Sequence, residues 1–446
     1  MAAPMRSAVT KVGAEMAAFG KQHLGRGIAR ATELVWDNGK GSWLYTVEGQ
    51  KYLDFTCGIG VTNLGHCHPK VVKAAQRQCD RIIHAQINAG YQKPQLELVQ
   101  KLLPVMPHES LDTFLWFNSG SEASENAVKL ARHATKKQNV IVMQGAFHGR
   151  TFGAMSMTRS KTIYSAGFGP LMSGVYVTPF PYTYHYLRET GGDKATAEDR
   201  CADHAIRELK LLLKQQTPAS DTAAIIIEPV LGEGGYVPAP QRYMEQLRKL
   251  CDENNILLII DEVQSGFGRT GTYFAIEQYG VRPDILVMAK GIANGFPLSG
   301  LASRKELMDK QAPGSMGGTY SGNAVACAAG VACADVMHEE KILENVAARG
   351  AQLRAGLESL RTSPTLAPLI GDIRGRGLMV GLEFSPEAPA GISARVQKAC
   401  LDRGLLVLTT SVFETLRFIP PLTVSKEEME KGLEIFGEAV REAVEA

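Results

Sequence analysis

The sequence lacks the cysteine patterns that mark disulfide frameworks and zinc sites. Its 446 residues contain eight cysteines, and no two of them form a Cys-x-x-Cys pair. Cysteines scattered in this way are typical of reduced thiols in an intracellular protein. The loop from Cys57 to His68 gathers two cysteines and two histidines, but no second ligand pair follows at the spacing of a zinc site. We therefore expect no metal centre.

Long apolar runs and dense clusters of one charge are also lacking. No stretch approaches the ~20 apolar residues that span a bilayer, so we expect no membrane segment. The net charge is +2 at pH 7, and no lysine- or arginine-rich run suggests a nucleic-acid surface. The first thirty residues carry five lysines and arginines and one acid, but no apolar core of a secretory signal. We expect a cytoplasmic protein, with a mitochondrial transit peptide as the alternative.

What the sequence does contain is a series of short apolar runs, each followed by a loop rich in glycine or polar residues. Runs without polar alternation suit strands that are buried on both faces of a parallel sheet. Between several of these runs lie helical patterns, which indicates an α/β protein with a mostly parallel sheet. The predicted strands are Phe114–Phe117, Val140–Met143, Ala224–Ile227, Ile256–Ile260 and Ile285–Ala289.

The length of the chain and its changes of pattern indicate two domains. Residues 43–55 have the composition of an antiparallel hairpin, and the polar stretch from Tyr182 to Ala219, helical in its second half, reads as a surface insertion or connection. We predict an N-terminal segment (1–68) that contributes to the small domain, a large α/β domain (69–330) and a C-terminal small α+β domain (331–446).

Two of the apolar runs end in ionisable residues, Asp261 and Lys290. In open α/β sheets, ligands bind at the carboxyl ends of the strands. A lysine amine in a partly desolvated site has a lowered pKa and can form a Schiff base with a carbonyl, although a surface lysine is the alternative. A carboxylate behind five apolar residues is expected to be buried with a cationic partner, which we predict to be a protonated pyridine nitrogen. A helix cap or a surface ion pair is the alternative for Asp261.

A phosphate needs backbone N–H donors and hydroxyl groups. Gly120 and Ser121 supply both at a predicted helix N-terminus, where the helix dipole favours an anion. An ordinary helix cap explains the same residues equally well. Phe147, which follows a predicted strand, has the type and place to stack on a cofactor ring, or to pack in the loop.

Six motifs in a fixed order carry a resemblance to a known family. They are Asn118–Ala123 (NSGSEA), Phe147–Arg150 (FHGR), Glu228–Gly234 (EPVLGEG), Asp261–Gln264 (DEVQ), Ala289–Gly291 (AKG) and Gly318–Asn323 (GTYSGN). From about Arg30 to the C-terminus, the sequence resembles the class III (ω-amino acid) pyridoxal-phosphate-dependent aminotransferases, and among these most the 4-aminobutyrate branch.

The resemblance implies a transferase of fold type I, with a mostly parallel seven-stranded-type sheet in the large domain, and pyridoxal 5'-phosphate (PLP) as cofactor. Lys290 would form the Schiff base and move the proton, and Asp261 would hold the ring nitrogen protonated. Thr319 would reach the phosphate of the neighbouring subunit's cofactor, so the resemblance also implies a homodimer with shared active sites. The remaining implied cofactor-binding residues are Gly120, Ser121, Phe147, His148, Glu228, Val263 and Gln264.

The same branch implies four substrate-binding residues. Ile59 and Arg150 would form the far wall and the carboxylate anchor for an ω-amino acid. Arg417 would bind the α-carboxylate of glutamate or 2-oxoglutarate, and Glu233 would pair with Arg417 until a dicarboxylate arrives. For Arg150 a structural ion pair in the loop is the alternative. Gly60 departs from the alanine expected in that branch and would widen the pocket.

The function implied is a ping-pong transfer of the amino group of an ω-amino acid, such as 4-aminobutyrate, to 2-oxoglutarate. An ornithine, acetylornithine or ω-amine:pyruvate aminotransferase is the alternative within the family. A nucleotide-dependent oxidoreductase is disfavoured because no predicted strand leads into a complete G-x-G-x-x-G. A non-enzymatic scaffold is disfavoured because it would not need the set of polar groups at the strand ends.

Overall fold

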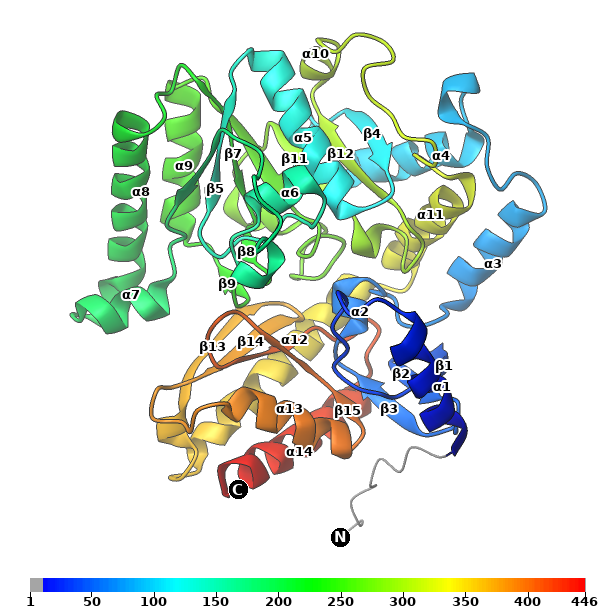
Figure 1. The fold of residues 1–446 in the computed structure, drawn as a ribbon, viewed down its shortest axis with the longest axis vertical. Coiled ribbons are helices and arrows are strands. Elements are labelled where there is room, and N and C mark those ends of the chain that lie inside the picture. Colours follow the sequence, from blue (N-terminus) through cyan, green and yellow to red (C-terminus); the bar gives the residue numbers. More distant parts are fainter. Residues whose placement is uncertain (1–10, 446) are drawn as a thin grey trace.

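The computed structural model describes residues 11–445. Residues 1–10 and 446, and with them part of the basic N-terminal stretch, lie outside the described residues. The largest element is a sheet of seven strands, in which every neighbouring pair is parallel except the two pairs that β12 forms. This confirms the predicted α/β class and the mostly parallel sheet (Figure 1). The strands are, in order across the sheet, β4 (Thr113–Phe117), β12 (Ser299–Ser303), β11 (Ile285–Met288), β10 (Leu257–Asp261), β7 (Thr222–Ile227), β5 (Asn139–Met143) and β6 (Val175–Thr178).

Helices cover both faces of this sheet. In β5, Val140 and Val142 pack toward α5 (Gly120–Thr135), whereas Ile141 and Met143 pack toward the helices of the opposite face. Successive strand residues point to opposite faces, so strands buried on both sides need apolar residues at every position. The opposite face is covered by α4 (Lys93–Leu102), α8 (Ala197–Gln215), α9 (Gln241–Glu253) and α11 (Ala324–Glu339).

The stretch from Tyr182 to Ala219 is a connection that is helical in its second half, as predicted, but it is not confined to the surface. This stretch forms α7 (Thr183–Thr190) and α8, which connect β6 to β7. Ala202, Ile206 and Leu209 of α8 are buried in the core beneath the sheet. The charged outer face of α8 dominates its composition and conceals the apolar stripe on the inner face.

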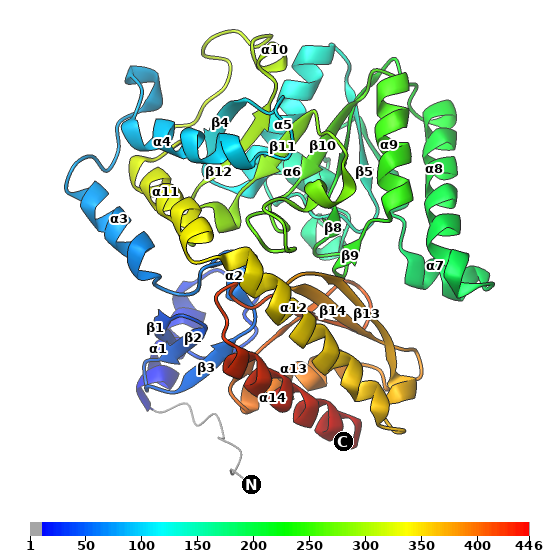
Figure 2. The ribbon, with the colours of Figure 1, turned by 180° about the vertical axis from the view of Figure 1, so that it is seen from behind.

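A second part of the molecule lies beyond one end of the large sheet (Figures 1 and 2). Its first sheet is the predicted hairpin with two flanking strands, and β3 pairs in parallel with β15, which joins the N-terminal strands to the C-terminal part of the chain. Residue 330 lies inside the continuous helix α11, so the division into domains at that point stays a prediction. The sheets are β1 (Trp36–Lys40), β2 (Trp43–Thr46), β3 (Lys51–Asp54) with β15 (Leu405–Leu406), and β13 (Ile370–Arg376), β14 (Met379–Phe384), β17 (Thr415–Phe418) with β16 (Leu408–Thr410).

Further helices pack around these sheets. Three of these helices, α12 (Ile342–Glu358), α13 (Ile392–Asp402) and α14 (Lys426–Glu445), form the core of the second part of the molecule together with its sheets. None of the helices among residues 11–445 is long and apolar enough to cross a membrane. The remaining elements are α1 (Lys11–His23), α2 (Cys57–Gly60), α3 (Pro69–Cys79), α6 (Phe152–Met157), α10 (Lys305–Met308) and the short pair β8 (Val230–Leu231) and β9 (Val237–Pro238).

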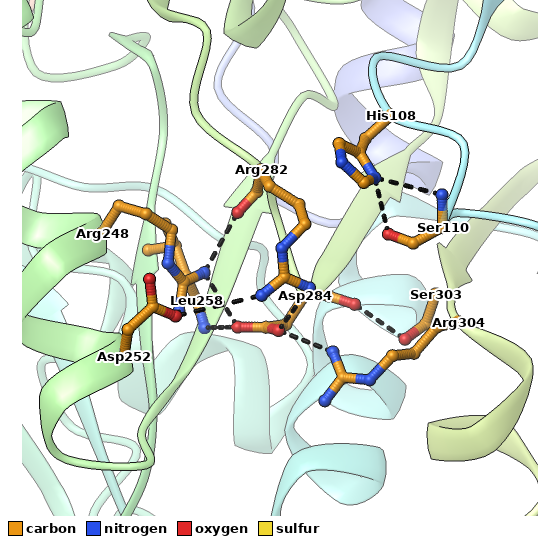
Figure 3. A network of polar contacts seen from close by, with 9 residues as sticks. All are labelled: His108, Ser110, Arg248, Asp252, Leu258, Arg282, Asp284, Ser303 and Arg304. Carbon is orange, nitrogen blue, oxygen red and sulfur yellow. Dashed lines mark hydrogen bonds and ion pairs between the residues drawn. The ribbon is translucent and has the colours of Figure 1, made fainter.

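The amino end of β11 holds a buried carboxylate, Asp284, in a network of partners (Figure 3). Arg304 and Arg248 donate to its two oxygens at 2.6 and 2.9 Å, and Arg282 lies 3.5 Å away. The main-chain N–H of Leu258 donates at 2.9 Å. Burial works to raise the pKa of Asp284, but the arginines and this N–H outweigh it and hold the pKa below its usual value. The network ties α9 and the segment before α10 to the sheet.

Candidate active site

The carboxyl ends of the parallel strands surround a cavity of about 300 Å³. The predicted cofactor-binding residues come to it from five separate segments of the chain, and only Thr319 is not among its lining residues. The residues that line it are Gly120, Ser121, Phe147, His148, Glu228, Asp261, Val263, Gln264 and Lys290. The fold therefore brings these side chains together, as expected for strand ends that meet at one edge of a sheet.

Asp261 ends β10 and is held by two hydrogen bonds. The main-chain N–H of Val263 donates to Oδ1 at 3.0 Å, and His148 Nδ1 lies 2.7 Å from Oδ2. Burial works to lower the pKa of His148, but the hydrogen bond to Asp261 and the charges of Asp261 and Glu228 outweigh it, so this pKa is raised. His148 thus orients the side chain of Asp261, whose carboxylate can accept a hydrogen bond from a cationic ring nitrogen.

Glu228 follows β7 and joins two loops of the site. Its carboxylate accepts hydrogen bonds from the main-chain N–H groups of Phe147 at 3.0 Å and Gly232 at 2.9 Å. Burial raises the pKa of this carboxyl to about 7; the charge of His148 opposes the rise, and that of Asp261 adds to it. Glu228 thus fixes the loop after β5 relative to the turn after β8.

Lys290 lies two residues beyond the end of β11 and opens a short 3₁₀ turn, Lys290–Ile292. Its backbone adopts φ = +50°, in the left-handed region that residues with a side chain rarely occupy. Such strained residues cluster at functional sites, where the surrounding structure holds them. Loss of water around the amine lowers the pKa of Lys290, although the charge of Glu233 acts in the opposite direction. A lowered pKa increases the fraction of neutral amine, which is the nucleophilic form.

The N-terminus of α5 forms one wall of the cavity. Ser119, not Ser121, caps this helix, in a capping box with Glu122. The hydroxyl of Ser121 instead accepts a hydrogen bond from the main-chain N–H of Arg150 at 3.0 Å. A Cβ atom at Gly149 would lie 2.1 Å from Ser121 Oγ, and one at Gly120 would lie 3.0 Å from the side chain of Val263. Both glycines therefore keep the helix end open to a ligand.

Glu233 and Arg417 form a buried ion pair in which Arg417 Nη1 donates to Glu233 Oε1. Glu233 lies in the turn between β8 and β9. Arg417 lies on β17, in the sheet formed by β13, β14, β17 and β16. Burial disfavours both charges, yet each partner stabilises the other, so the pKa of Arg417 is raised and that of Glu233 is lowered. The charges of both residues act on Lys290, which places the pair at the edge of the same site.

Arg150 is exposed, and its guanidinium lies against aromatic rings. It is 4.9 Å from the ring centroid of Tyr164 and 5.9 Å from that of Phe147. No ion pair of Arg150 with a carboxylate is found among residues 11–445, so the alternative of a structural ion pair in the loop has no support there. The Phe147 ring packs edge-on against Tyr164, with centroids 5.2 Å apart.

Five predicted residues do not line the cavity: Arg150, Glu233 and Arg417, described above, and also Ile59 and Thr319. Ile59 is 38% exposed, and Val61 occupies the lining position instead. Thr319 is exposed in the segment that follows α10. Gly60 does not widen the cavity, because a Cβ atom there would lie 2.6 Å from the Cδ1 of Ile419. Its φ of +72° also disfavours alanine. The expectation of a wider pocket at Gly60 is therefore replaced by one of close packing.

Sequence reasoning missed several residues that the fold adds to the site. Tyr164 contacts the guanidinium of Arg150; burial raises the pKa of its hydroxyl, and the charges of Glu233, Arg150 and Arg417 also act on it. It comes from a short 3₁₀ turn, Thr162–Tyr164, with no distinguishing sequence pattern. The role of Gly149 was detectable, since a glycine directly after His148 in a strand-end loop indicates close approach of another chain segment. The other unpredicted lining residues are Val61, Asn118, Ser119, Ala289, Gly295, Phe296, Pro297 and Leu298.

The cavity fits a phosphorylated pyridine aldehyde. Two of its buried polar atoms, His148 Nε2 and Gln264 Oε1, have no hydrogen-bond partner among the described residues. A lysine, a carboxylate and an open helix N-terminus all face the same space. Among residues 11–445 no group of three or more His, Cys, Asp or Glu side chains is placed to hold a metal ion. A mostly parallel seven-stranded sheet with a lysine and an aspartate at adjacent strand ends defines a PLP-dependent transferase of fold type I.

Comparison with known proteins narrows this class. The family model for class-III aminotransferases matches residues 28–440, and the chain belongs to that family. It is 41% identical over 424 residues to 5-aminovalerate aminotransferase DavT of Pseudomonas putida, covering 94% of this chain and 96% of that protein. It is 39% identical over 428 residues to 4-aminobutyrate aminotransferase GabT of Escherichia coli, covering 95% and 97%. The protein is thus a transaminase, and its cofactor is PLP.

Solved structures agree with this assignment. An (S)-enantioselective omega-transaminase from Thermomicrobium roseum superimposes with a TM-score of 0.88 at 31% identity, covering 97% of this chain and 99% of that one. An amine transaminase from an uncultivated Pseudomonas species, solved in its PLP-bound form, gives 0.84 at 29% identity, covering 95% and 97%. The recognition of the family from its motifs is confirmed.

Proposed function

We propose that this enzyme transfers the amino group of an ω-amino acid of four or five carbons to 2-oxoglutarate in two half-reactions. The observation that carries this proposal is the buried Glu233–Arg417 pair beside Lys290. The relatives named for 5-aminovalerate and 4-aminobutyrate support the donor class.

The ion pair suits an enzyme whose two substrates differ by one carboxylate. An ω-amino acid has a single carboxylate at its far end, so nothing on the substrate can neutralise Arg417 next to the reacting amine. A buried arginine without a partner is costly by about 3–5 kcal/mol, and Glu233 removes this cost. When 2-oxoglutarate binds, its α-carboxylate replaces Glu233 on the guanidinium, whose planar fork matches a carboxylate.

Arg150 is the anchor that we assign to the distal carboxylate. Its guanidinium lies over the ring of Tyr164 and is free of the described carboxylates, so it can accept an anion without breaking an existing pair. The charges of Arg150 and Arg417 both act on Tyr164, which suits a substrate chain stretched between two carboxylate sites. Ile59 would narrow the mouth of the site.

Lys290 and Asp261 are the residues to which we assign the chemistry. PLP, when bound, supplies an aldehyde that takes up the amino group and a pyridine ring that withdraws electrons. The amine of Lys290, with its lowered pKa, would hold the cofactor through that aldehyde and, once the donor amine has displaced it, would carry a proton as acid and base. Asp261, oriented by His148 and Val263, would hold the proton on the ring nitrogen.

The other cofactor contacts follow from the lining of the cavity. The N–H groups at Gly120 and Ser121 would hold the phosphate at the α5 N-terminus. Gln264 Oε1, which has no partner among residues 11–445, would meet the phenolic oxygen. Phe147 would cover one face of the ring.

We assign Thr319 to the active site of a second copy of the chain, in a homodimer. Thr319 is exposed and does not line the cavity of its own chain. Its neighbour Tyr320 is 64% exposed, and its ring lies 5.5 Å from that of His84. Asn323 donates to the carbonyl of Ile83, so this segment lies beside the exposed apolar side chains Ile82 and Ile83. Exposed apolar side chains of this kind mark protein interfaces.

A panel of donors and acceptors with two arginine variants tests the proposal. We expect Arg150→Ala to raise the KM for 4-aminobutyrate or 5-aminovalerate at least about tenfold, because one charge-assisted bidentate contact is lost. Arg417→Ala is expected to impair both 2-oxoglutarate and pyruvate by a similar factor, because both carry the α-carboxylate that Arg417 binds. Arg150→Ala should spare pyruvate, which lacks a second carboxylate. Lys305→Ala, an exposed change on α10, serves as the control. If both ω-amino acids fail as donors and acetylornithine or a simple amine reacts instead, the donor assignment is wrong.

A further inference from the structure

A row of three residues crosses the four-stranded sheet β13–β14–β17–β16 beneath the turn that carries Glu233. Arg374 of β13 is paired with Gly381 of β14, and Gly381 is paired with Arg417 of β17. Directly paired residues point to the same face of a sheet. The two arginines therefore lie on one face, separated by a residue without a side chain. A Cβ atom at Gly381 would lie 3.0 Å from the carbonyl oxygen of Gly235, so the turn between β8 and β9 rests on this glycine.

The two arginines hold different parts of that turn. Arg417 bonds to the side chain of Glu233. Arg374 donates from Nε to the main-chain carbonyl of Gly235 at 2.9 Å. The carbonyl of Glu233 itself accepts from the main-chain N–H of Ser411 at 2.9 Å and from Thr410 Oγ1 at 3.1 Å. One arginine thus binds the group that is expected to move, and the other binds the main chain that is expected to stay.

Arg374 is itself fixed by buried partners. Its Nη2 donates to Glu383 Oε2 at 2.7 Å, and its Nη1 donates to Asp372 at 3.2 Å. The hydroxyl of Tyr182 also donates to Glu383 Oε2, at 2.6 Å, and His185 Nε2 lies 2.8 Å from Glu383 Oε1. Arg374 is 8% exposed and Glu383 is 2% exposed. Burial works to raise the pKa of Glu383, but His185 and Arg374 outweigh it and this pKa is lowered.

We propose that Arg374, held by Glu383, is a positioning residue for donor recognition that acts through Glu233. By fixing the carbonyl of Gly235, it keeps the turn in the one position from which Glu233 reaches Arg417. The donor half-reaction needs that pair, because an ω-amino acid leaves Arg417 without any other counter-charge. The inference rests on the proposed function of the Glu233–Arg417 pair.

A lysine cannot reproduce this role. Its ammonium is one point charge on a flexible stem, whereas the guanidinium bonds to Gly235 and to Glu383 at once from fixed directions. Arg374→Lys therefore keeps the buried charge beside Glu383 and removes the tether to the turn. Arg376→Lys is the matched control, because Arg376 lies two residues along the same strand and bonds to Gln278.

The experiment is a double-mutant cycle on the PLP-loaded enzyme, with kcat and KM measured for each half-reaction. Glu233→Gln is expected to raise the KM for 4-aminobutyrate or 5-aminovalerate about tenfold, and Arg374→Lys about three- to fivefold. In the Glu233→Gln background, Arg374→Lys should add less than twofold, because a residue that acts through Glu233 has no effect once Glu233 is changed. Glutarate, a dicarboxylate that cannot react, should bind to both single variants two- to threefold more tightly in calorimetry, since Glu233 competes less for Arg417.

The outcomes separate the inference from the proposed function. If the wild-type enzyme uses neither ω-amino acid, the proposed function fails. If it uses one and Arg374→Lys behaves like Arg376→Lys, or if the effects of the two changes multiply, the inference is overturned. Tyr182→Phe removes one hydrogen bond from Glu383 and gives a second test. It should raise the donor KM about twofold, again only when Glu233 is present, and an equal rise in both backgrounds would contradict the tether.

Discussion

The amino ends and the carboxyl ends of the strands in the large sheet both carry buried charged side chains, but the surroundings of these side chains differ. At the amino end of β11, Asp284 is surrounded by arginines and receives a main-chain N–H, so its charge is fully matched (Figure 3). At the carboxyl ends, Asp261 and Lys290 face a cavity in which buried polar atoms lack partners and the lysine backbone is strained. Charged groups at strand ends are therefore no sign of a site by themselves. The sign is a cavity lined by unpartnered polar atoms, here His148 Nε2 and Gln264 Oε1, since single atoms without a partner among residues 11–445, such as Arg248 Nε, also occur away from it.

The largest effect that we expect comes from Lys290→Ala. Loss of the amine removes both the bond to the aldehyde and the proton transfer, so turnover should fall at least about a thousandfold. The free energy of unfolding of the cofactor-free protein should change by less than about 1 kcal/mol, because Lys290 makes no ion pair that alanine would break. Steady-state kinetics and urea unfolding measure the two quantities. Substantial turnover in Lys290→Ala would refute the assignment.

For Asp284→Asn we expect the reverse of the Lys290→Ala result: a large loss of unfolding free energy and a small change in kcat. Asp284→Asn leaves the surrounding arginines without their buried counter-charge and should cost about 3 kcal/mol in the free energy of unfolding. The kcat of the folded fraction should stay within about twofold, since the network lies at the far end of the strands. Asp309→Asn, an exposed partner of Lys305, is the control and should cost less than about 0.5 kcal/mol. A marked loss of kcat without loss of stability in Asp284→Asn would reverse the comparison.

The smallest effect that we expect is a pH dependence of the difference in unfolding free energy between wild type and Asp284→Asn. The folded-state pKa of Asp284 is lowered, so its ionised form contributes stability above the unfolded-state pKa of about 3.9. That contribution is lost as the pH falls through the still lower folded-state pKa. The difference in unfolding free energy between wild type and Asp284→Asn should therefore be full at pH 7 and shrink below about pH 4. A difference that stays constant from pH 7 to pH 3 would mean that the charge of Asp284 contributes nothing.

The parts of the fold that the sequence predicted are those with strong local signals. The five predicted strands are found as β4, β5, β7, β10 and β11, because uninterrupted β-branched and apolar runs leave little alternative. The two strands of the large sheet that were not predicted are β6 and β12. Strand β12 reads Ser-Gly-Leu-Ala-Ser, which has low β-propensity, and its place between β4 and β11 is set by tertiary packing.

The site was predictable where one residue follows one strand. Asp261 and Lys290 were predicted in this way, and the parallel topology brings them to one cavity. Tyr164 and the network of Arg374 and Glu383 could not be found, because they meet the site through packing between segments far apart in the chain. Ile59 and Thr319 were inferred from family resemblance alone, and their roles stay predictions.

The short element α2 has a bearing on how the catalytic pocket comes into being. Four consecutive residues, Cys57 to Gly60, have φ between +51° and +72°, so the segment is a left-handed turn. Each residue with a side chain costs roughly 1–2 kcal/mol in that conformation. The turn is held by Asp54, which accepts from the N–H of Cys57 at 3.1 Å, and by the buried guanidinium of Arg269 at 3.6 Å from its sulfur. Arg269 also bonds to Pro420 and Asn63. Val61, which directly follows this turn, can reach its place in the cavity lining only after distant segments have met, so an incompletely folded chain has no finished pocket.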